Sequence, residues 1–220
     1  NRPMTDSSSS PVASDDSRLV GWRAVAVEMV EGARAAVLRF PVTAAALLAL
    51  AINANLLITD IRGFWGGVDD LLPPLFGAAS ASLAASIVLE ARHAPSPLRH
   101  GMALLAGLVA FAIAWWDHLS GVEHWSYATA LCGLMLVAPA LGGRSAGAFW
   151  LFMVRFAFAV LVSVLALFLF AGGISAILAS LTYLFGVEVP HRAYEHVWAA
   201  TGLLAAPLFG LGRIPPDLDA

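Results

Sequence analysis

Apolar residues occur along this chain in long runs that short polar segments separate. Runs of 17–19 residues recur, with few charged positions inside them. An α-helix of 18 residues is about 27 Å long, close to the ~30 Å hydrocarbon core of a bilayer. We therefore expect membrane-spanning helices at residues 41–58, 72–89, 98–116, 125–141 and 195–212.

One apolar stretch is longer than the others. It covers residues 146–187 and contains a single charge, Arg155. Because glycine is a poor helix former, Gly172-Gly173 is expected to divide the stretch. We expect residues 156–171 to form the main membrane helix of this stretch. Residues 174–186 then continue that helix, kink away from it or lie along the outer interface. This helix brings the expected number of spans to about six.

Composition supports this interpretation. Of the 220 residues, 60% are apolar and 12% are charged, and the mean hydropathy is +0.80. A soluble domain carries about a quarter charged residues, so a soluble enzyme is nearly excluded. All twelve cationic residues are arginine, against fifteen acidic residues, and this balance offers no basic surface for nucleic acid. The expected fold is an all-α polytopic membrane protein whose main partner is the lipid bilayer.

The ends of the chain differ from the membrane domain, which we place at residues 41–213. Residues 1–17 are polar and predict a disordered tail. Residues 18–40 have the pattern of an amphipathic helix, with arginine and glutamate on one face and apolar residues on the other. That helix either lies in the membrane interface or packs on the protein's own cytoplasmic face. Residues 214–220 are expected to begin a linker that continues in a longer protein.

The distribution of arginine predicts the orientation of the chain. Cytoplasmic loops of membrane proteins carry an excess of cationic residues. With the N-terminus in the cytoplasm, the outer loops hold only Arg62 and Arg192. The cytoplasmic segments hold the other ten: Arg2, Arg18, Arg23, Arg34, Arg39, Arg92, Arg99, Arg144, Arg155 and Arg213. Six spans then return the C-terminus to the cytoplasm.

Three short motifs show a resemblance to a known family. Arg-Phe-Pro at 39–41 leads into the first span, Leu-Phe-Gly at 184–186 ends the long stretch, and Gly-Arg-Ile-Pro-Pro-Asp at 212–217 follows the last span. With the six-span layout, they resemble the N-terminal half of the bacterial membrane proteins of domain of unknown function 4153. The resemblance covers about residues 35–217. It implies a bacterial inner-membrane protein with further helices beyond this segment, and it supplies no activity or catalytic residue.

A few polar side chains fall inside the expected spans. Asn53 and Asn55 lie in the first one, where each amide needs a hydrogen-bond partner. They either hold neighbouring helices together or line a path for an ion or substrate. Arg155 lies near the cytoplasmic end of the long stretch, where its guanidinium can extend to the interface. Alternatively, it belongs to a functional path inside the membrane.

The outer loops contain the residues that a metal site would need. His118 and His124 lie in one loop, while His191 and Glu195 lie four residues apart and would share one helix face. No compact zinc motif accompanies them, so ordinary exposed loop residues are the simpler interpretation. We assign no catalytic, cofactor-binding or metal-binding residue from the sequence, and we expect no cofactor.

Small residues form a stripe on the last expected span. Gly202, Ala206 and Gly210 recur at four-residue spacing, which places them nearly in line on one helix face. In lipid, such a strip lets two helices approach closely. It is expected to dock a neighbouring helix in this chain, in the rest of a longer protein or in a second copy. Pro207 beside it should bend the helix.

Three functional classes are compatible with these features. A non-enzymatic membrane subunit or scaffold is the first interpretation, because charged groups inside the spans are scarce. Half of a transporter is the second, and it would bring Asn53, Asn55 and Gly172 together near the middle of the membrane. A membrane enzyme with an outer-face metal site is the third, and it would bring together His118, His124 and His191. Partners would be lipid, further helices of the same protein or a second copy.

Overall fold

The computed structural model describes residues 31–59, 71–116, 121–141 and 146–214. All elements in these ranges are helical, as expected from the sequence. The expected tail at 1–17, residues 18–30 of the amphipathic helix and residues 215–220 of the linker lie outside them. The described elements are α2 (Pro41–Ile58), α3 (Leu72–Ala91), α4 (Ser96–Trp116), α5 (Gly121–Leu141), α6 (Ala146–Phe185), α7 (His191–Ala200), η2 (Thr201–Ala205) and α8 (Ala206–Gly212).

The first four of these helices follow the expected spans closely. α2 has the predicted bounds, because Pro41 suits the first helical turn, where its missing N–H has no partner to lose. Pro73 and Pro74 start α3 in the same way. α3 and α4 are joined by a short turn in which His93 has a φ of 55°. The polar breaks between apolar runs therefore determined where these helices end.

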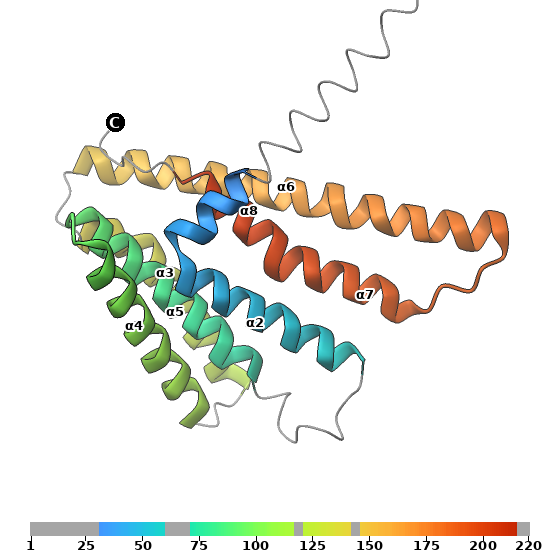
Figure 1. The fold of residues 1–220 in the computed structure, drawn as a ribbon, viewed down its shortest axis with the longest axis horizontal. Helices are drawn as coiled ribbons and strands as arrows, with labels where there is room; N and C mark the ends of the chain where they lie inside the picture. The colour runs from blue at the N-terminus through green and yellow to red at the C-terminus, as the bar shows by residue number, and fades with distance from the viewer. Residues whose placement is uncertain (1–30, 60–70, 117–120, 142–145, 215–220) are drawn as a thin grey trace, which may run out of the picture.

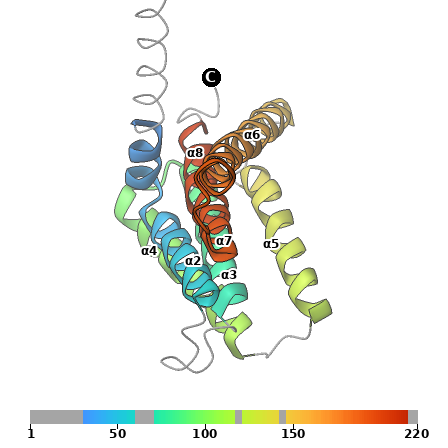
Figure 2. The ribbon, with the colours of Figure 1, turned by 90° about the vertical axis from the view of Figure 1, so that its right-hand side faces the viewer.

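α3 is the central helix of the bundle and packs on α2, α4 and α5 (Figures 1 and 2). Its small residues, serine and alanine among them, permit close contact between helices. Gly107 of α4 lies against α3, and a Cβ built on Gly107 would sit 3.2 Å from the Ala78 carbonyl oxygen. Ser82 is fully buried, and its Oγ lies 2.9 Å from Thr43 Oγ1 of α2.

α6 corrects the expected division of the long apolar stretch. It is one continuous helix of 40 residues, so it starts ten residues before the expected main helix at 156–171 and runs through Gly172-Gly173. Of the three alternatives for residues 174–186, continuation of the helix is the one that the structure confirms. Two glycines weaken a helix by about 1 kcal/mol each, but in apolar surroundings a broken helix would also leave backbone groups without partners. The helix ends at Gly186, whose φ of +65° suits glycine.

The last expected span is built from three helical pieces that follow one another. α7 is followed by the π-helical turn η2 and then by α8. Pro207, in the first turn of α8, cannot donate a backbone hydrogen bond and crowds the carbonyl four residues earlier. The wider π-helical turn directly precedes this proline. The expected bend at Pro207 remains a prediction; what the structure shows before this proline is a π-helical turn.

The strip formed by Gly202, Ala206 and Gly210 docks on α6, which confirms the expectation that it packs against a neighbouring helix. A Cβ on Gly202 would lie 3.7 Å from Leu167 Cδ1 of α6. A Cβ on Gly210 would collide with Ser163 Oγ and would lie 3.5 Å from Ser163 Cβ. Ala206 is 8% exposed. Of the three possible partners, the strip therefore contacts a helix of its own chain.

The described part of the N-terminal helix, residues 31–39, packs on the bundle. Ala36 and Phe40 are each 1% exposed and belong to the apolar core. Gly32 contacts the end of α8 so closely that a Cβ on Gly212 would collide with its carbonyl oxygen. For these residues, the structure favours packing on the protein's own face over the interfacial alternative.

Four described helices are long and apolar enough to cross a membrane. They are Pro41–Ile58, Leu72–Ala91, Ser96–Trp116 and Phe149–Phe185. A shorter apolar helix covers Ser126–Ala138. α6 extends beyond the other helices, and α7 lies between α6 and α2 (Figures 1 and 2). Six membrane spans remain a prediction.

Candidate functional site

A cluster of charged groups holds one end of the bundle together. The Arg39 Nε donates to both carboxylate oxygens of Glu90, at 3.0 and 3.2 Å, and its Nη2 donates to Oε2 at 3.0 Å. The Arg99 Nη1 lies 3.4 Å from Glu90 Oε1. The Arg39 Nη1 also donates to the Ile214 carbonyl oxygen. We call Arg39, Glu90 and Arg99 with this carbonyl the Glu90 cluster.

The positions of these charges explain why they need each other. Glu90 lies in the last turn of α3 and Arg99 in the first turn of α4, where each charge is opposed by its own helix dipole. The three side chains are only 16–17% exposed, so water compensates them little. The Glu90 carboxylate lies between the two guanidinium groups. Its attraction to them offsets both the unfavourable helix dipoles and the loss of contact with water. The Glu90 cluster thus joins the start of α2 to α3, α4 and the end of α8.

Arg92 makes a further link at the same end of the bundle. Its Nη2 donates to the Leu141 carbonyl oxygen at 2.8 Å, which satisfies one of the last carbonyl groups of α5. The ends of α3, α5 and α8 and the starts of α2 and α4 therefore meet at one end of the molecule. The arginines at this end predict that it faces the cytoplasm.

The two asparagines of α2 have different surroundings. Asn53 is 5% exposed. The Asn55 Nδ2 donates to the Ala51 carbonyl at 2.7 Å, and its Oδ1 lies 2.7 Å from the Nδ1 of His196 on α7. Asn55 thus joins two helices, as the packing interpretation predicted. Gly172 has no side chain or backbone of another element within 4 Å of its Cβ position, so it does not join the asparagines.

We expect the Asn55–His196 hydrogen bond to stabilise the α2–α7 contact measurably. Asn55→Ala and His196→Ala should each destabilise the protein. In a double-mutant cycle, their effects should couple by about 0.6–1.7 kcal/mol, the range for hydrogen bonds between membrane helices. Unfolding by denaturing detergent measures both terms. His191→Ala and Arg192→Ala, at exposed positions at the start of α7, serve as control substitutions. Additive effects of Asn55→Ala and His196→Ala would contradict the prediction.

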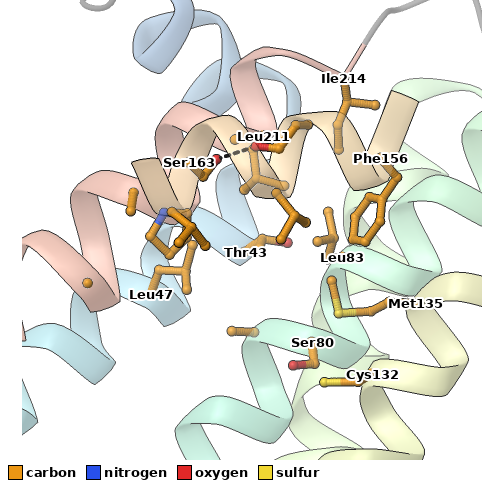
Figure 3. A pocket seen from close by; sticks show the side chains of 18 of the residues that line it. Thr43, Leu47, Ser80, Leu83, Cys132, Met135, Phe156, Ser163, Leu211 and Ile214 are labelled. Atoms are coloured by element: carbon orange, nitrogen blue, oxygen red, sulfur yellow. Dashed lines mark hydrogen bonds between the residues drawn. The ribbon is translucent and has the colours of Figure 1, made fainter. Parts of the chain in front are cut away.

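A cavity of about 360 Å³ lies between α2, α3 and α5 on one side and α6 and α8 on the other (Figure 3). We call it the α6–α8 cavity. Apolar side chains form most of its wall, and the small-residue strip on η2 and α8 forms one side. Leu47, Leu83, Met135, Phe156, Leu167, Leu211 and Ile214 are among its lining residues.

Two hydroxyl groups in the cavity wall have partners within the protein. The Ser163 Oγ donates to the Ala159 carbonyl at 2.7 Å, and Thr43 Oγ1 pairs with Ser82. Ser80 and Cys132 lie together at one end of the cavity (Figure 3). This arrangement favours an apolar occupant over a polar substrate. Asn53, Asn55 and Gly172 do not line the cavity.

The other candidate residues remain apart in the described structure. Arg155 is partly exposed near the start of α6, consistent with a guanidinium that extends to the interface. His191 Nε2 lies 3.6 Å from Glu195 Oε1, with side chains 87% and 46% exposed. His118 lies outside the described residues, and the structure does not describe the side chain of His124. Within the described ranges, no group of three potential metal ligands comes together.

Sequence reasoning missed the Glu90 cluster and the partner of Asn55. The partners in these contacts are 51 and 141 residues apart, so no local pattern connects them. One signal was available: a glutamate in the last turn of an apolar helix opposes the helix dipole and needs a cation nearby. Comparisons with protein-family models, curated proteins and solved structures found no match to this chain.

Proposed function

We propose that this protein is a non-enzymatic, multi-pass subunit or scaffold of a bacterial inner membrane. One observation carries the proposal: three polar contacts in the apolar helices join one helix to another. Thr43 pairs with Ser82, Asn55 with His196, and the Tyr127 hydroxyl donates to the Ala110 carbonyl at 2.7 Å. Apolar side chains also form most of the wall of the α6–α8 cavity.

Six passes through the membrane fit this arrangement. The chain reverses direction at each step from α2 to α5. The starts of α2 and α4 and the ends of α3 and α5 all lie at the Glu90 cluster and Arg92. α6 leaves from that end, and α7, η2 and α8 return to it at Ile214. In this proposal both termini of the segment face the cytoplasm, and the motifs that resemble domain of unknown function 4153 belong to the same membrane domain.

The exposed side of α6 provides the surface for assembly. Leu161, Leu165 and Leu169 are 64–66% exposed and repeat at four-residue spacing, so they share one face. Lipid can cover such a face, and so can further helices of the same protein or a second copy. A scaffold whose own spans are already joined would use this face for its partners.

Cysteine labelling tests the proposed threading. In a Cys132→Ala background, Asp69→Cys should react with an impermeant thiol reagent on intact cells, because the loop after α2 is outside. Ser96→Cys, at the start of α4, should react only after permeabilisation. The two variants control for each other in the same preparation. Labelling in the reverse pattern would overturn the orientation, and equal labelling of both sites on intact cells would overturn the membrane assignment.

Half of a transporter is the second candidate function. The π-helical turn beside Pro207 supports it, because interrupted helices often mark substrate sites in transporters. The Asn55–His196 pair adds a polar contact between two helices. The expected break at Gly172-Gly173 does not support it, because α6 is continuous there. The scaffold is therefore the better supported proposal.

A further inference from the structure

The α6–α8 cavity reaches the end of the bundle where arginines gather. We infer that this end binds one anionic phospholipid, with an acyl chain in the cavity and the phosphate beside Arg155 and Arg213. The inference rests on the proposed membrane function and specifies a ligand for the protein.

The shape and chemistry of the cavity suit a hydrocarbon chain. Its volume of about 360 Å³ is in the range of small-ligand sites. An ordered water needs two to four polar partners. The hydroxyl groups of Ser163 and Thr43 already have partners in the protein, which leaves the Ser80 hydroxyl and the Cys132 thiol among the lining side chains. A flexible acyl chain can adapt to a space between packed helices, whereas another helix with its side chains needs a channel at least about 10 Å wide.

Two arginines lie where the cavity reaches the bundle end. Ile214 and Phe156 line the cavity, and Arg213 and Arg155 directly precede them in the sequence. Neither arginine forms part of the cavity wall. Arg155 lies four residues before the lining residue Ala159 and about 100° around the helix from Phe156, so it stands at the edge of the face of α6 that borders the cavity. A phosphate at this end can thus approach both guanidinium groups while the attached chain enters the cavity.

The charge balance at this end favours an anionic headgroup over a zwitterionic one. Among the described residues, six arginines stand here against two glutamates: Arg34, Arg39, Arg92, Arg99, Arg155 and Arg213 against Glu31 and Glu90. The opposite end has one arginine and three glutamates, Arg192 against Glu123, Glu188 and Glu195. Arginines near a cytoplasmic surface attract anionic lipid. The excess of arginine at this end suits the phosphate of the lipid, and the adjacent apolar cavity suits its acyl chain.

Native mass spectrometry of the purified full chain tests the headgroup. The chain is mixed with equal amounts of phosphatidylglycerol and phosphatidylcholine that carry identical acyl chains. We expect phosphatidylglycerol to bind about thirtyfold more tightly, which corresponds to roughly 1 kcal/mol for each of two arginines. The double variant R155Q/R213Q should bind the two lipids nearly equally. R192Q, at the opposite end, should keep the preference.

Variants that fill the cavity test the acyl chain. Cys132→Phe fills it from α5 and Ser80→Leu from α3, and each should weaken binding of both lipids at least tenfold. Leu134→Phe adds the same ring to an exposed position of α5 and should bind like the parent. Circular dichroism establishes that each variant keeps its helical content. Because two different variants fill the cavity, the test can still be read if one of them misfolds.

The outcomes separate this inference from the proposed function. Equal binding of both lipids by the parent, or a preference that survives in R155Q/R213Q, would overturn the headgroup site. If the folded variants with a filled cavity bind lipid as well as the parent does, the acyl chain does not lie in the cavity. Displacement of the lipid by a second copy of the chain would likewise overturn the cavity as the acyl-chain site. If cysteine labelling shows the proposed threading while lipid binding fails, only this inference falls. If the labelling fails, the proposed function falls.

Discussion

Replacing Glu90 with alanine is expected to lower the free energy of unfolding by about 3–5 kcal/mol, the typical cost of removing one partner from a buried ion pair. Glu90 accepts three hydrogen bonds from Arg39 and lies 3.4 Å from Arg99. Its removal leaves two mostly buried guanidinium groups without the carboxylate between them. Unfolding of the purified protein by denaturing detergent, followed by circular dichroism, measures the change.

Two further variants show whether the charge of Glu90 causes this effect. Glu90→Gln keeps the size and some hydrogen bonding of the side chain, so it should fall between the parent and Glu90→Ala. Glu31→Ala removes an exposed carboxylate from the same end of the molecule and should change stability by less than about 0.5 kcal/mol. Equal effects of Glu31→Ala and Glu90→Ala would show that the cluster contributes nothing specific.

Replacing Gly210 with leucine is expected to destabilise the protein by about 3 kcal/mol through overpacking. Even a Cβ at this position would collide with Ser163 Oγ on α6. Gly202 lies on the same strip but has room, since its Cβ position is 3.7 Å from Leu167 and it lines the cavity. Gly202→Leu should therefore cost much less than Gly210→Leu. Thermal melts in detergent compare the two variants.

A rescue experiment locates the collision. Ser163→Ala removes the Oγ and leaves the Cβ 3.5 Å away, an ordinary contact, so Gly210→Ala should be far better tolerated in that background. Gly173→Leu changes an exposed glycine of α6 that has nothing within 4 Å of its Cβ position, and it should leave the melting temperature nearly unchanged. If Gly210→Leu melts like Gly173→Leu, the strip makes no tight contact with α6.

The helices of this fold could be predicted where the sequence carries its own start and stop signals. The bounds of α2 followed from Pro41 and the polar residues after Ile58, because proline placement and burial act locally. The continuity of α6 could not be predicted from helix propensity, which is measured in water. There, an interrupted backbone can bond to solvent, and this option is lost in apolar surroundings. The π-helical form of the irregularity before Pro207 likewise depends on how the flanking helices pack.

The contacts that define the site were less accessible from the sequence. The strip at Gly202 and Gly210 could be recognised from its spacing, but the spacing does not specify which helix it meets. Arg39 was assigned to the polar face of an amphipathic helix, where it would contact solvent or headgroups. In the structure it bonds to Glu90, 51 residues away. Such a pairing depends on how α2 and α3 are arranged in space.

The length of α6 has a consequence for the bilayer around the protein. Thirty residues of α6 follow Arg155, whose guanidinium extends to the interface, and they give a helix about 45 Å long against the ~30 Å thickness of a hydrocarbon core. The far end is apolar and exposed at Leu184 and Phe185, so inclining the helix by about 50° from the membrane normal keeps this part in hydrocarbon. Average membrane helices tilt by about 20°. A thicker membrane would let α6 stand more upright, and α8, docked on it through Gly210, would follow. Bilayer thickness would thereby change the angle between α6 and the rest of the bundle.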